Sequence, residues 1–122
     1  MEPQKFSIRS RIKSFSFALA GIKSFIIREH NARIHLVSTL AVIIVAWYLH
    51  VSLTEAAVLT IVIGMVWITE LLNTCVERLA DLVTLERNPQ IKIIKDLAAG
   101  AVLIAALTAV IVGLFIFIPK IL

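Results

Sequence analysis

The stretch from Ala56 to Arg78 reads AAVLTIVIGMVWITELLNTCVER and places two acidic residues, Glu70 and Glu77, inside a hydrophobic segment. The apolar run before the first acid covers only the 14 residues from Ala56 to Thr69. A helix needs ~20 residues to cross the hydrocarbon core of a bilayer. If this segment crosses a membrane, it therefore takes Glu70 and Asn73 with it.

The composition of the whole chain indicates a membrane protein. Of its 122 residues, 60% are hydrophobic, and the mean hydropathy is +0.98, whereas soluble domains are ~45–50% apolar. Lipid offers no hydrogen-bond partners, so the backbone of a spanning segment must be satisfied within the protein. We predict an all-α membrane protein with a single domain over residues 1–122. The one cysteine, Cys75, cannot form a disulfide within the chain.

Hydrophobic stretches with little charge predict three transmembrane helices. The first covers about residues 34–53, the third covers about 91–118, and the second, about 56–83, contains the acidic residues. Eleven of the twelve lysines and arginines lie before the first span or between Arg78 and Lys95, where the second span ends and the third begins. The positive-inside rule then predicts a cytoplasmic N-terminus and a C-terminus outside. The first 30 residues have no uninterrupted apolar core, which argues against a cleavable signal peptide.

Residues 6–30 have the pattern of an amphipathic helix that lies on the membrane surface. Apolar residues recur at helical spacing and form one stripe. Its members are Phe15, Leu19, Ile22 and Ile26. Glu29 continues the stripe, and a carboxylate on the lipid-directed side is unfavourable unless it meets a partner. Two interpretations remain: Glu29 faces another helix near the cytoplasmic surface, or the helix ends before it and the side chain reaches water.

The second span has a polar face. Glu70, Asn73, Glu77 and Asp81 are spaced i, i+3, i+7 and i+11, which places them on one side of a helix over about 16 Å. A carboxylate at the depth of Glu70 costs roughly 2.5–3.5 kcal/mol on insertion scales, and such residues usually mark proton, ion or substrate chemistry. We therefore predict that Glu70 is functional. For Asn73 the alternative interpretation is a hydrogen-bonding group between helices. For Glu77 and Asp81 it is that they are solvated acids paired with nearby arginines.

Charged residues at the start of the third span reach the same depth. The turn signal Asn88-Pro89 leads into a segment that ends in Lys95 and Asp96. These two residues arrive at the level of Glu77, near the cytoplasmic surface. One interpretation is a salt-bridge cluster at the membrane boundary. The other is a site in which acids hold a divalent cation and a lysine meets phosphate, at the height of a lipid headgroup.

Common nucleotide and metal motifs are absent from the sequence. The four glycines are too widely spaced for a G-x-x-x-x-G-K-[ST] or a G-x-G-x-x-G loop. The three histidines, His30, His35 and His50, do not form a zinc-binding pattern. The basic N-terminal region accompanies an apolar stripe, which favours anionic lipid headgroups over nucleic acid as its partner.

Several runs resemble the signature of the small prokaryotic diacylglycerol kinase family. The central run is ELLNTCVE at 70–77, followed by DLVT at 81–84 and KDLAAGAVL at 95–103. Upstream, GIK at 21–23 and EHNARIH at 29–35 extend the similarity over most of the chain. The E-x-x-N-x-x-x-E spacing with a downstream K-D pair is specific to this signature.

The resemblance implies a fold and a reaction. The fold is a homotrimeric bundle in the bacterial cytoplasmic membrane, in which each protomer has a surface helix and three membrane helices and neighbouring subunits share the active sites. The reaction is transfer of the γ-phosphoryl group of ATP to the hydroxyl of a membrane lipid alcohol, with Mg²⁺ as cofactor. Phosphoryl transfer depends mainly on alignment and charge neutralisation, so a nucleotide-binding loop is not required.

The resemblance also implies roles for individual residues. Glu70 looks like the general base that accepts the proton of the lipid hydroxyl, and Asn73 looks like its positioning partner. Glu29 and Glu77 look like the carboxylates that hold Mg²⁺ on the nucleotide phosphates. Three further positions look like contacts with the nucleotide: Lys95, Asp96 and, near the adenine, Glu86.

The sequence departs from the family pattern at two places. Diacylglycerol enzymes of the family have an aromatic and hydroxyl-bearing stretch near the start of the surface helix, where this chain has Phe17-Ala18-Leu19. Residues 31–35 are more like the branch that phosphorylates undecaprenol, which slightly favours undecaprenol over diacylglycerol. The family also tends to have an arginine that contacts ATP near residue 10, where Arg9 and Arg11 flank Ser10; both arginines are candidates.

Two functions of other classes stand as alternatives. A small proton-coupled transporter also places a glutamate inside the membrane, but it spreads polar residues through the whole bilayer depth, and the outer half of these spans is apolar. A non-catalytic membrane subunit explains three hydrophobic helices, but it does not explain the shared depth of the polar residues at positions 70, 73, 77, 95 and 96.

Overall fold

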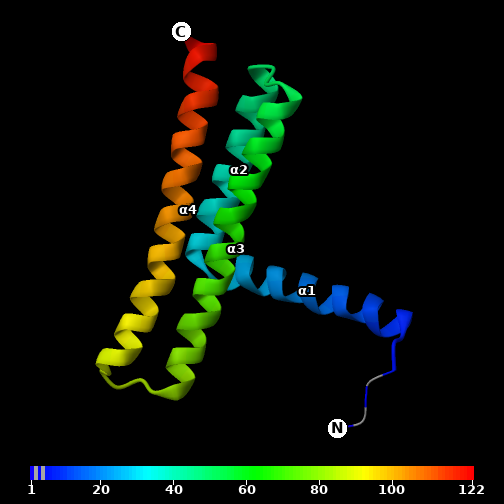
Figure 1. Ribbon diagram of the computed structural model, residues 1–122, viewed down its shortest axis with the longest axis vertical. Coiled ribbons are helices and arrows are strands. Elements are labelled where there is room, and N and C mark those ends of the chain that lie inside the picture. The colour runs from blue at the N-terminus through cyan, green and yellow to red at the C-terminus, as the bar shows by residue number, and fades with distance from the viewer. Residues whose placement is uncertain (2, 4) are drawn as a thin grey trace.

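The computed structural model describes residues 1, 3 and 5–122, and every regular element in this part of the chain is a helix. The helices are α1 (Ile8–Arg28), α2 (His30–Tyr48), α3 (Leu53–Val83) and α4 (Pro89–Ile121). α2, α3 and α4 run alongside one another, and α1 projects sideways from them (Figure 1). α2, α3 and α4 are each long and apolar enough to cross a membrane. The predicted all-α class is therefore confirmed.

α1 is a separate helix because the backbone turns at Glu29. The Ser7 side chain caps its start by accepting a hydrogen bond from the Ser10 amide, and Glu29 ends it in an extended conformation with φ −107° and ψ 126°. The guanidinium of Arg33 donates to the carbonyls of Ile26 and Ile27, which satisfies acceptors that the end of a helix leaves free. The corner between α1 and α2 is thus held by hydrogen bonds across it.

The apolar stripe of α1 is mostly uncovered by protein. Phe15, Leu19 and Ile22 are 71%, 66% and 41% exposed, respectively, whereas Phe25 is buried. Phe25 meets Trp67 of α3 edge-on, with ring centroids 6.2 Å apart and an interplanar angle of 72°. α1 is therefore packed against the bundle near its C-terminal end, and most of its apolar stripe is not covered by protein.

The ends of α2 differ from the predicted span. The helix begins at His30 rather than Ile34 and ends at Tyr48 rather than Leu53. Its end is a Schellman motif, in which the Val51 amide bonds the Ala46 carbonyl, the His50 amide bonds the Trp47 carbonyl, and His50 takes a left-handed φ of 53°. Uncharged residues continue past this stop to Thr54, so the length of the uncharged run misplaced the helix end.

Local capping residues also fix the ends of α3 and α4. Ser52 and Glu55 form a capping box, so α3 begins at Leu53 rather than at residue 56 and runs unbroken to Val83. Asn88 caps α4 by accepting from the amides of Gln90 and Ile91, and Pro89 occupies its first turn. α4 therefore begins two residues before the predicted start and ends at Ile121 rather than at residue 118.

The helices are held together by a thin core. α4 packs chiefly on α3, and α2 has a smaller contact with α3. The buried apolar residues are Phe25, Ala32, Leu59, Val62, Val66, Ala80, Ala105 and Ile116. At the end opposite the α3–α4 loop, Lys120 pairs with Glu55 over 3.0 Å and ties α4 to the start of α3. Most apolar side chains of α2 and α4 consequently face outward, as in a membrane-spanning segment.

Candidate active site

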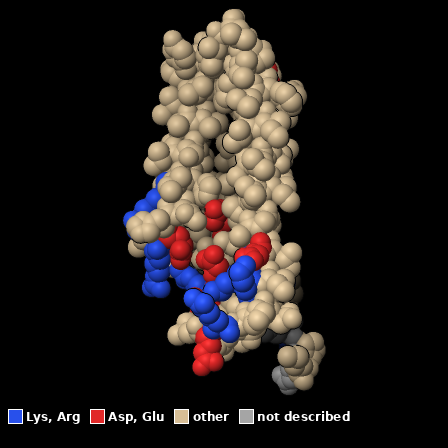
Figure 2. Space-filling view, turned by 90° about the vertical axis from the view of Figure 1, so that its left-hand side faces the viewer, with Lys and Arg blue, Asp and Glu red and all other residues tan. Residues whose placement is uncertain are grey.

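Charged side chains gather at one end of the molecule. Figure 2 shows lysine, arginine, aspartate and glutamate side chains together in the lower half of the bundle, with an almost uncharged surface above them. The loop between α3 and α4 lies at this charged end, and the turn between α2 and α3 lies at the other (Figure 1). The predicted polar residues of α3 and α4 therefore lie toward one end of the bundle.

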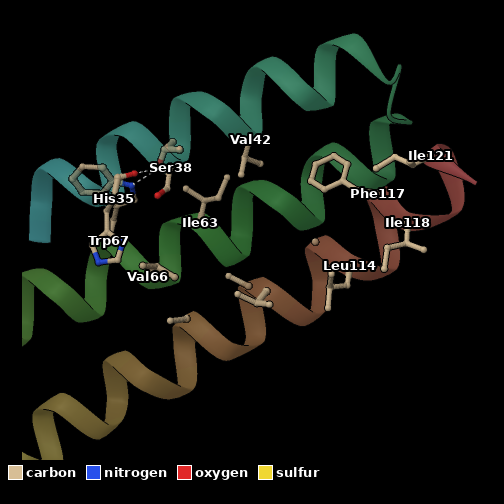
Figure 3. A pocket seen from close by; sticks show the side chains of 15 residues that line it. His35, Ser38, Val42, Ile63, Val66, Trp67, Leu114, Phe117, Ile118 and Ile121 are labelled. Atoms are coloured by element: carbon tan, nitrogen blue, oxygen red, sulfur yellow. Dashed lines mark hydrogen bonds between the residues drawn. The ribbon is translucent and has the colours of Figure 1, made fainter.

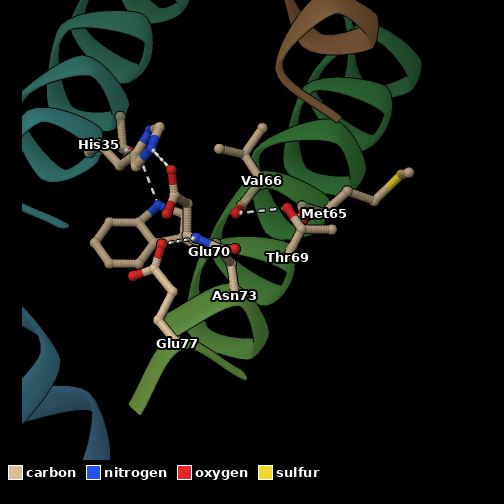
Figure 4. Close-up of polar contacts among 9 residues, drawn as sticks. His35, Met65, Val66, Thr69, Glu70, Asn73 and Glu77 are labelled. Atoms are coloured by element: carbon tan, nitrogen blue, oxygen red, sulfur yellow. Dashed lines mark hydrogen bonds and ion pairs between the residues drawn. The ribbon is translucent and has the colours of Figure 1, made fainter. Parts of the chain in front are cut away.

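Glu70 is the most enclosed acid of the site. It is 5% exposed, and its Oε1 lies 2.8 Å from Nε2 of His35 on α2 (Figure 4). When the carboxylate is ionised it can only accept hydrogen bonds, and Nε2–H of the imidazole is then the donor. The contact joins residues 35 positions apart and was not predicted. Its one sequence signal was a lone histidine inside an apolar span, since polar residues in such spans are often functional.

A second set of hydrogen bonds reaches the backbone carbonyl of His35. The indole Nε1–H of Trp67 donates to Oγ1 of Thr39 over 2.9 Å, and the Thr39 hydroxyl donates to the backbone carbonyl of His35 over 2.6 Å. Trp67 itself packs against Phe25 of α1. Side chains from α1, α2 and α3 therefore converge beside Glu70, and sequence reasoning had singled out none of these partners.

Asn73 and Glu77 continue the polar face of α3 toward the charged end. Asn73 is 9% exposed and its Nδ2 donates to Oε1 of Glu77 over 3.4 Å (Figure 4). Its carbonyl oxygen Oδ1 is buried and has no hydrogen-bond partner among the residues that the structure describes. An unsatisfied buried acceptor costs about 1–3 kcal/mol, so this oxygen marks a place where a bound molecule can supply a donor. Glu77 itself is exposed.

Glu29 meets α3 at the corner between α1 and α2. Nη2 of Arg78 donates to Oε1 of Glu29 over 2.8 Å. α1 ends just before Glu29, as the interpretation with a water-exposed side chain predicted. The Glu29 side chain is only one-third exposed, however, and contacts another helix, as the alternative interpretation predicted. The structure therefore combines the two, and it gives Arg78 a partner on a different element rather than the neighbouring acids of α3.

The number of acids near one another in the structure bears on whether the site could hold a metal ion. Within the part of the chain that the structure describes, no three His, Cys, Asp or Glu side chains come together as a metal site. Mg²⁺ is usually bound by one or two carboxylates together with substrate phosphates. The exposed carboxylate of Glu77 and the one-third exposed carboxylate of Glu29, which Arg78 contacts, are of the chemical kind that could hold such an ion together with phosphate oxygens.

The charged residues of α4 are paired. Nζ of Lys95 lies 2.8 Å from Oδ1 of Asp81 on α3, and Nζ of Lys92 lies 2.6 Å from Oδ2 of Asp96 one turn further along α4. The second pair is largely exposed, and exposed pairs are worth little, about 0–1 kcal/mol. These pairs match the salt-bridge interpretation of the boundary, and an ammonium group retains further donors for a phosphate.

The remaining predicted contacts lie outside this cluster. Glu86 is exposed in the loop between α3 and α4, where its amide bonds the Thr84 hydroxyl. Arg9 and Arg11 lie near the start of α1, at the end that projects away from the bundle, and Arg11 stacks over Phe6 at 5.7 Å. A single chain therefore does not bring these arginines to Glu70.

An apolar groove begins beside the His35–Glu70 pair. It lies between α2, α3 and α4, has a volume of about 480 Å³ and runs away from the charged end (Figure 3). Its polar lining residues are His35, Ser38, Thr39 and Trp67, and its far end is lined by residues such as Phe117 and Ile121. The groove therefore offers an apolar channel with a polar inner end next to the carboxylate.

Comparisons with known proteins agree on one family. The family described as "Prokaryotic diacylglycerol kinase" matches residues 16–117. "Undecaprenol kinase" of Bacillus subtilis is 39% identical over 108 residues, which cover 88% of each chain. "Diacylglycerol kinase" of Synechocystis is 43% identical over 110 residues, covering 89% of this chain and 63% of the relative. "Diacylglycerol kinase" of Pseudomonas aeruginosa is 33% identical over 109 residues, covering 86% and 89%. The chain therefore belongs to the prokaryotic diacylglycerol kinase family and is a lipid kinase.

Proposed function

We propose that this kinase transfers the γ-phosphoryl group of ATP, as its magnesium complex, to the hydroxyl of a membrane lipid alcohol. The observation that carries the proposal is the placement of Glu70. Its carboxylate is almost fully buried, adjoins the polar end of an apolar groove through His35, and shares a helix face with Asn73 and Glu77. A hydroxyl held at the groove and a nucleotide held at the charged end would meet at this carboxylate.

In the proposed reaction Glu70 is the general base. The lipid oxygen attacks the γ-phosphorus, a new P–O bond forms, and the bond from that phosphorus to the oxygen of the departing ADP breaks. The hydroxyl proton passes to the Glu70 carboxylate, and the ADP leaves with its negative charge. Asn73 holds its place beside the base, with its buried Oδ1 available to a donor on the substrate. The groove holds the hydrocarbon chain of the lipid in line with the phosphate.

Residues at the charged end bind the nucleotide in this proposal. Glu29 and Glu77 hold Mg²⁺, which when bound neutralises phosphate charge during transfer. The ammonium group of Lys95 donates to a phosphate with the N–H groups that do not bond Asp81. Asp96 contacts the nucleotide, and Glu86 lies near the adenine. Arg9 and Arg11 are the candidates for a further phosphate contact.

We infer the orientation and assembly from charge and packing. The charged end and the N-terminus face the cytoplasm, where ATP is found, and the C-terminus faces outward. The slight contact of α2 with the other helices leaves apolar surface that neighbouring subunits of a homotrimer would cover. In such a trimer a neighbouring chain supplies what one chain lacks, including an arginine from the projecting start of α1.

Undecaprenol is the lipid alcohol that we propose as substrate, with diacylglycerol as the competing one. The sequence of residues 31–35 favours the undecaprenol branch, and the Bacillus subtilis relative named for that lipid matches along 88% of both chains. The relatives named for diacylglycerol are of similar identity. The two substrates therefore require direct comparison.

The test is a phosphoryl-transfer assay with the purified protein in mixed micelles. Labelled ATP and magnesium are supplied with undecaprenol in one arm and diacylglycerol in the other, and the labelled lipid phosphate is measured. We expect transfer in both arms with the higher kcat/KM for undecaprenol. Absence of label in either lipid contradicts the proposed reaction, whereas a preference for diacylglycerol contradicts only the choice of substrate.

A further inference from the structure

We propose that His35 is a positioning residue for the base: it holds the Glu70 carboxylate in one orientation, so that a single oxygen faces the substrate. The inference rests on the proposed role of Glu70. The hydrogen bond from His35 occupies Oε1, and no other protein group in the described part of the chain bonds either carboxylate oxygen. Oε2 is therefore the oxygen left for the lipid hydroxyl.

The geometry favours a fixed imidazole over a mobile one. The side chain of His35 is 22% exposed and that of Glu70 is 6% exposed, so the 2.8 Å contact is largely shielded from water. Hydrogen bonds to charged groups in such surroundings are stronger than those between neutral groups. A carboxylate without this donor would be free to rotate about its side-chain torsions in a site that has no other anchor for it.

The position of His35 depends on the contact between α2, the helix that carries it, and α3. Thr39 lies one turn along α2, and its hydroxyl both donates to the His35 carbonyl and accepts from Trp67. The bond from Trp67 joins α3 to α2 at the level of Glu70, whereas the bond to the His35 carbonyl lies within α2 and holds the Thr39 hydroxyl in place. Phe25 of α1 supports Trp67 from the other side. The imidazole is thus placed by contacts that do not involve the nucleotide residues.

His35 also lines the apolar groove, which places it between the lipid and the base. A residue that only packed the bundle would influence stability and both substrates alike. A residue that positions Glu70 would influence the rate of transfer and leave the binding of Mg-ATP unchanged, because Glu77 and Lys95 have their own partners, Asn73 and Asp81. The two roles therefore differ in which kinetic constant changes.

The experiment compares His35→Leu, His35→Gln and His35→Asn in the micelle assay, with kcat and both KM values measured. Glutamine can place an amide N–H near the position of Nε2, whereas asparagine is too short to do so. We expect kcat to fall about 10- to 100-fold in His35→Leu and His35→Asn, with KM for Mg-ATP changed less than twofold, and His35→Gln to recover most of the rate. His50→Asn at the outer turn is the matched control, because asparagine tolerates the left-handed backbone there.

The double variant His35→Leu, Glu70→Gln separates this proposal from the proposed function. If His35 acts through Glu70, the double variant is no slower than Glu70→Gln alone. Equal rates for His35→Gln and His35→Asn, full kcat in His35→Leu, or a further tenfold loss in the double variant would overturn the role of His35. A full rate in Glu70→Gln would instead overturn the base assignment itself. If His35→Leu does not fold, the Gln and Asn pair still decides.

Discussion

The ring of Phe25 on α1 packs edge-on against the indole of Trp67 on α3, with centroids 6.2 Å apart and planes inclined by 72°. It is the one aromatic contact between the projecting helix and the bundle within the residues that the structure describes. Phe25 is 4% exposed, the lowest value along α1. The indole nitrogen of the same Trp67 bonds Thr39, one turn from His35, so the contact links the surface helix to the surroundings of Glu70.

We predict that Phe25→Ala detaches the end of α1. Truncating a buried phenylalanine costs about 3–5 kcal/mol in well-packed cores, so the thermal midpoint falls by several degrees and trypsin cleaves faster after Lys23 and Arg28. Phe15→Ala is the control, since Phe15 is 71% exposed. Equal cleavage rates for the two variants would mean that Phe25 does not anchor the helix.

We predict that Asn73→Leu retains stability and loses activity. The substitution removes the buried unsatisfied Oδ1, and the exposed Glu77 can exchange its lost donor for water. The thermal midpoint in detergent therefore stays the same or rises, while kcat falls about 100-fold, a typical loss when a reactant is misplaced. Thermal unfolding and the transfer assay are run on the same preparation. A parallel loss of both quantities would assign Asn73 to packing alone.

We predict that Glu77→Ala weakens the use of Mg-ATP more than the binding of lipid. Removing one of two carboxylate ligands raises the magnesium concentration for half-maximal rate, by about tenfold or more. Glu55→Gln is the matched control, because Glu55 is an acid of the same helix at the opposite end, paired with Lys120. Titrations of magnesium at fixed ATP measure the effect. A change confined to the lipid KM would contradict the metal-binding role.

We predict that Lys95→Gln raises the KM for ATP several-fold, whereas Lys92→Gln changes it less than twofold. Both lysines lie on α4 and both pair with an aspartate, but Lys95 is directed to α3 and is 37% exposed, whereas Lys92 is 76% exposed and bonds only its own helix. Initial rates against ATP concentration at saturating lipid give the two values. Similar shifts in both variants would indicate a general loss of positive charge rather than a specific contact.

The sequence alone specified the class of the fold, the helices and the polar face of α3, because hydrophobic length and helical spacing act locally along the chain. Glu70, Asn73 and Glu77 were placed on one face from spacing, and the structure joins the last two directly. The ends of the helices were less accurate. They depend on the Schellman motif at His50 and the capping box at Ser52, whose hydrogen bonds stop one helix and start the next within a stretch that has no charged residue from Ile34 to Thr54.

Only the tertiary structure decided which side chains meet across helices. The contact of His35 with Glu70 spans 35 residues, that of Arg78 with Glu29 spans 49, and that of Lys95 with Asp81 spans 14. Each depends on the rotation and depth of one helix against another, which the thin buried core sets, together with the Trp67–Thr39 bond between α2 and α3. Periodicity shows which residues share a face, but only packing shows what that face is turned toward.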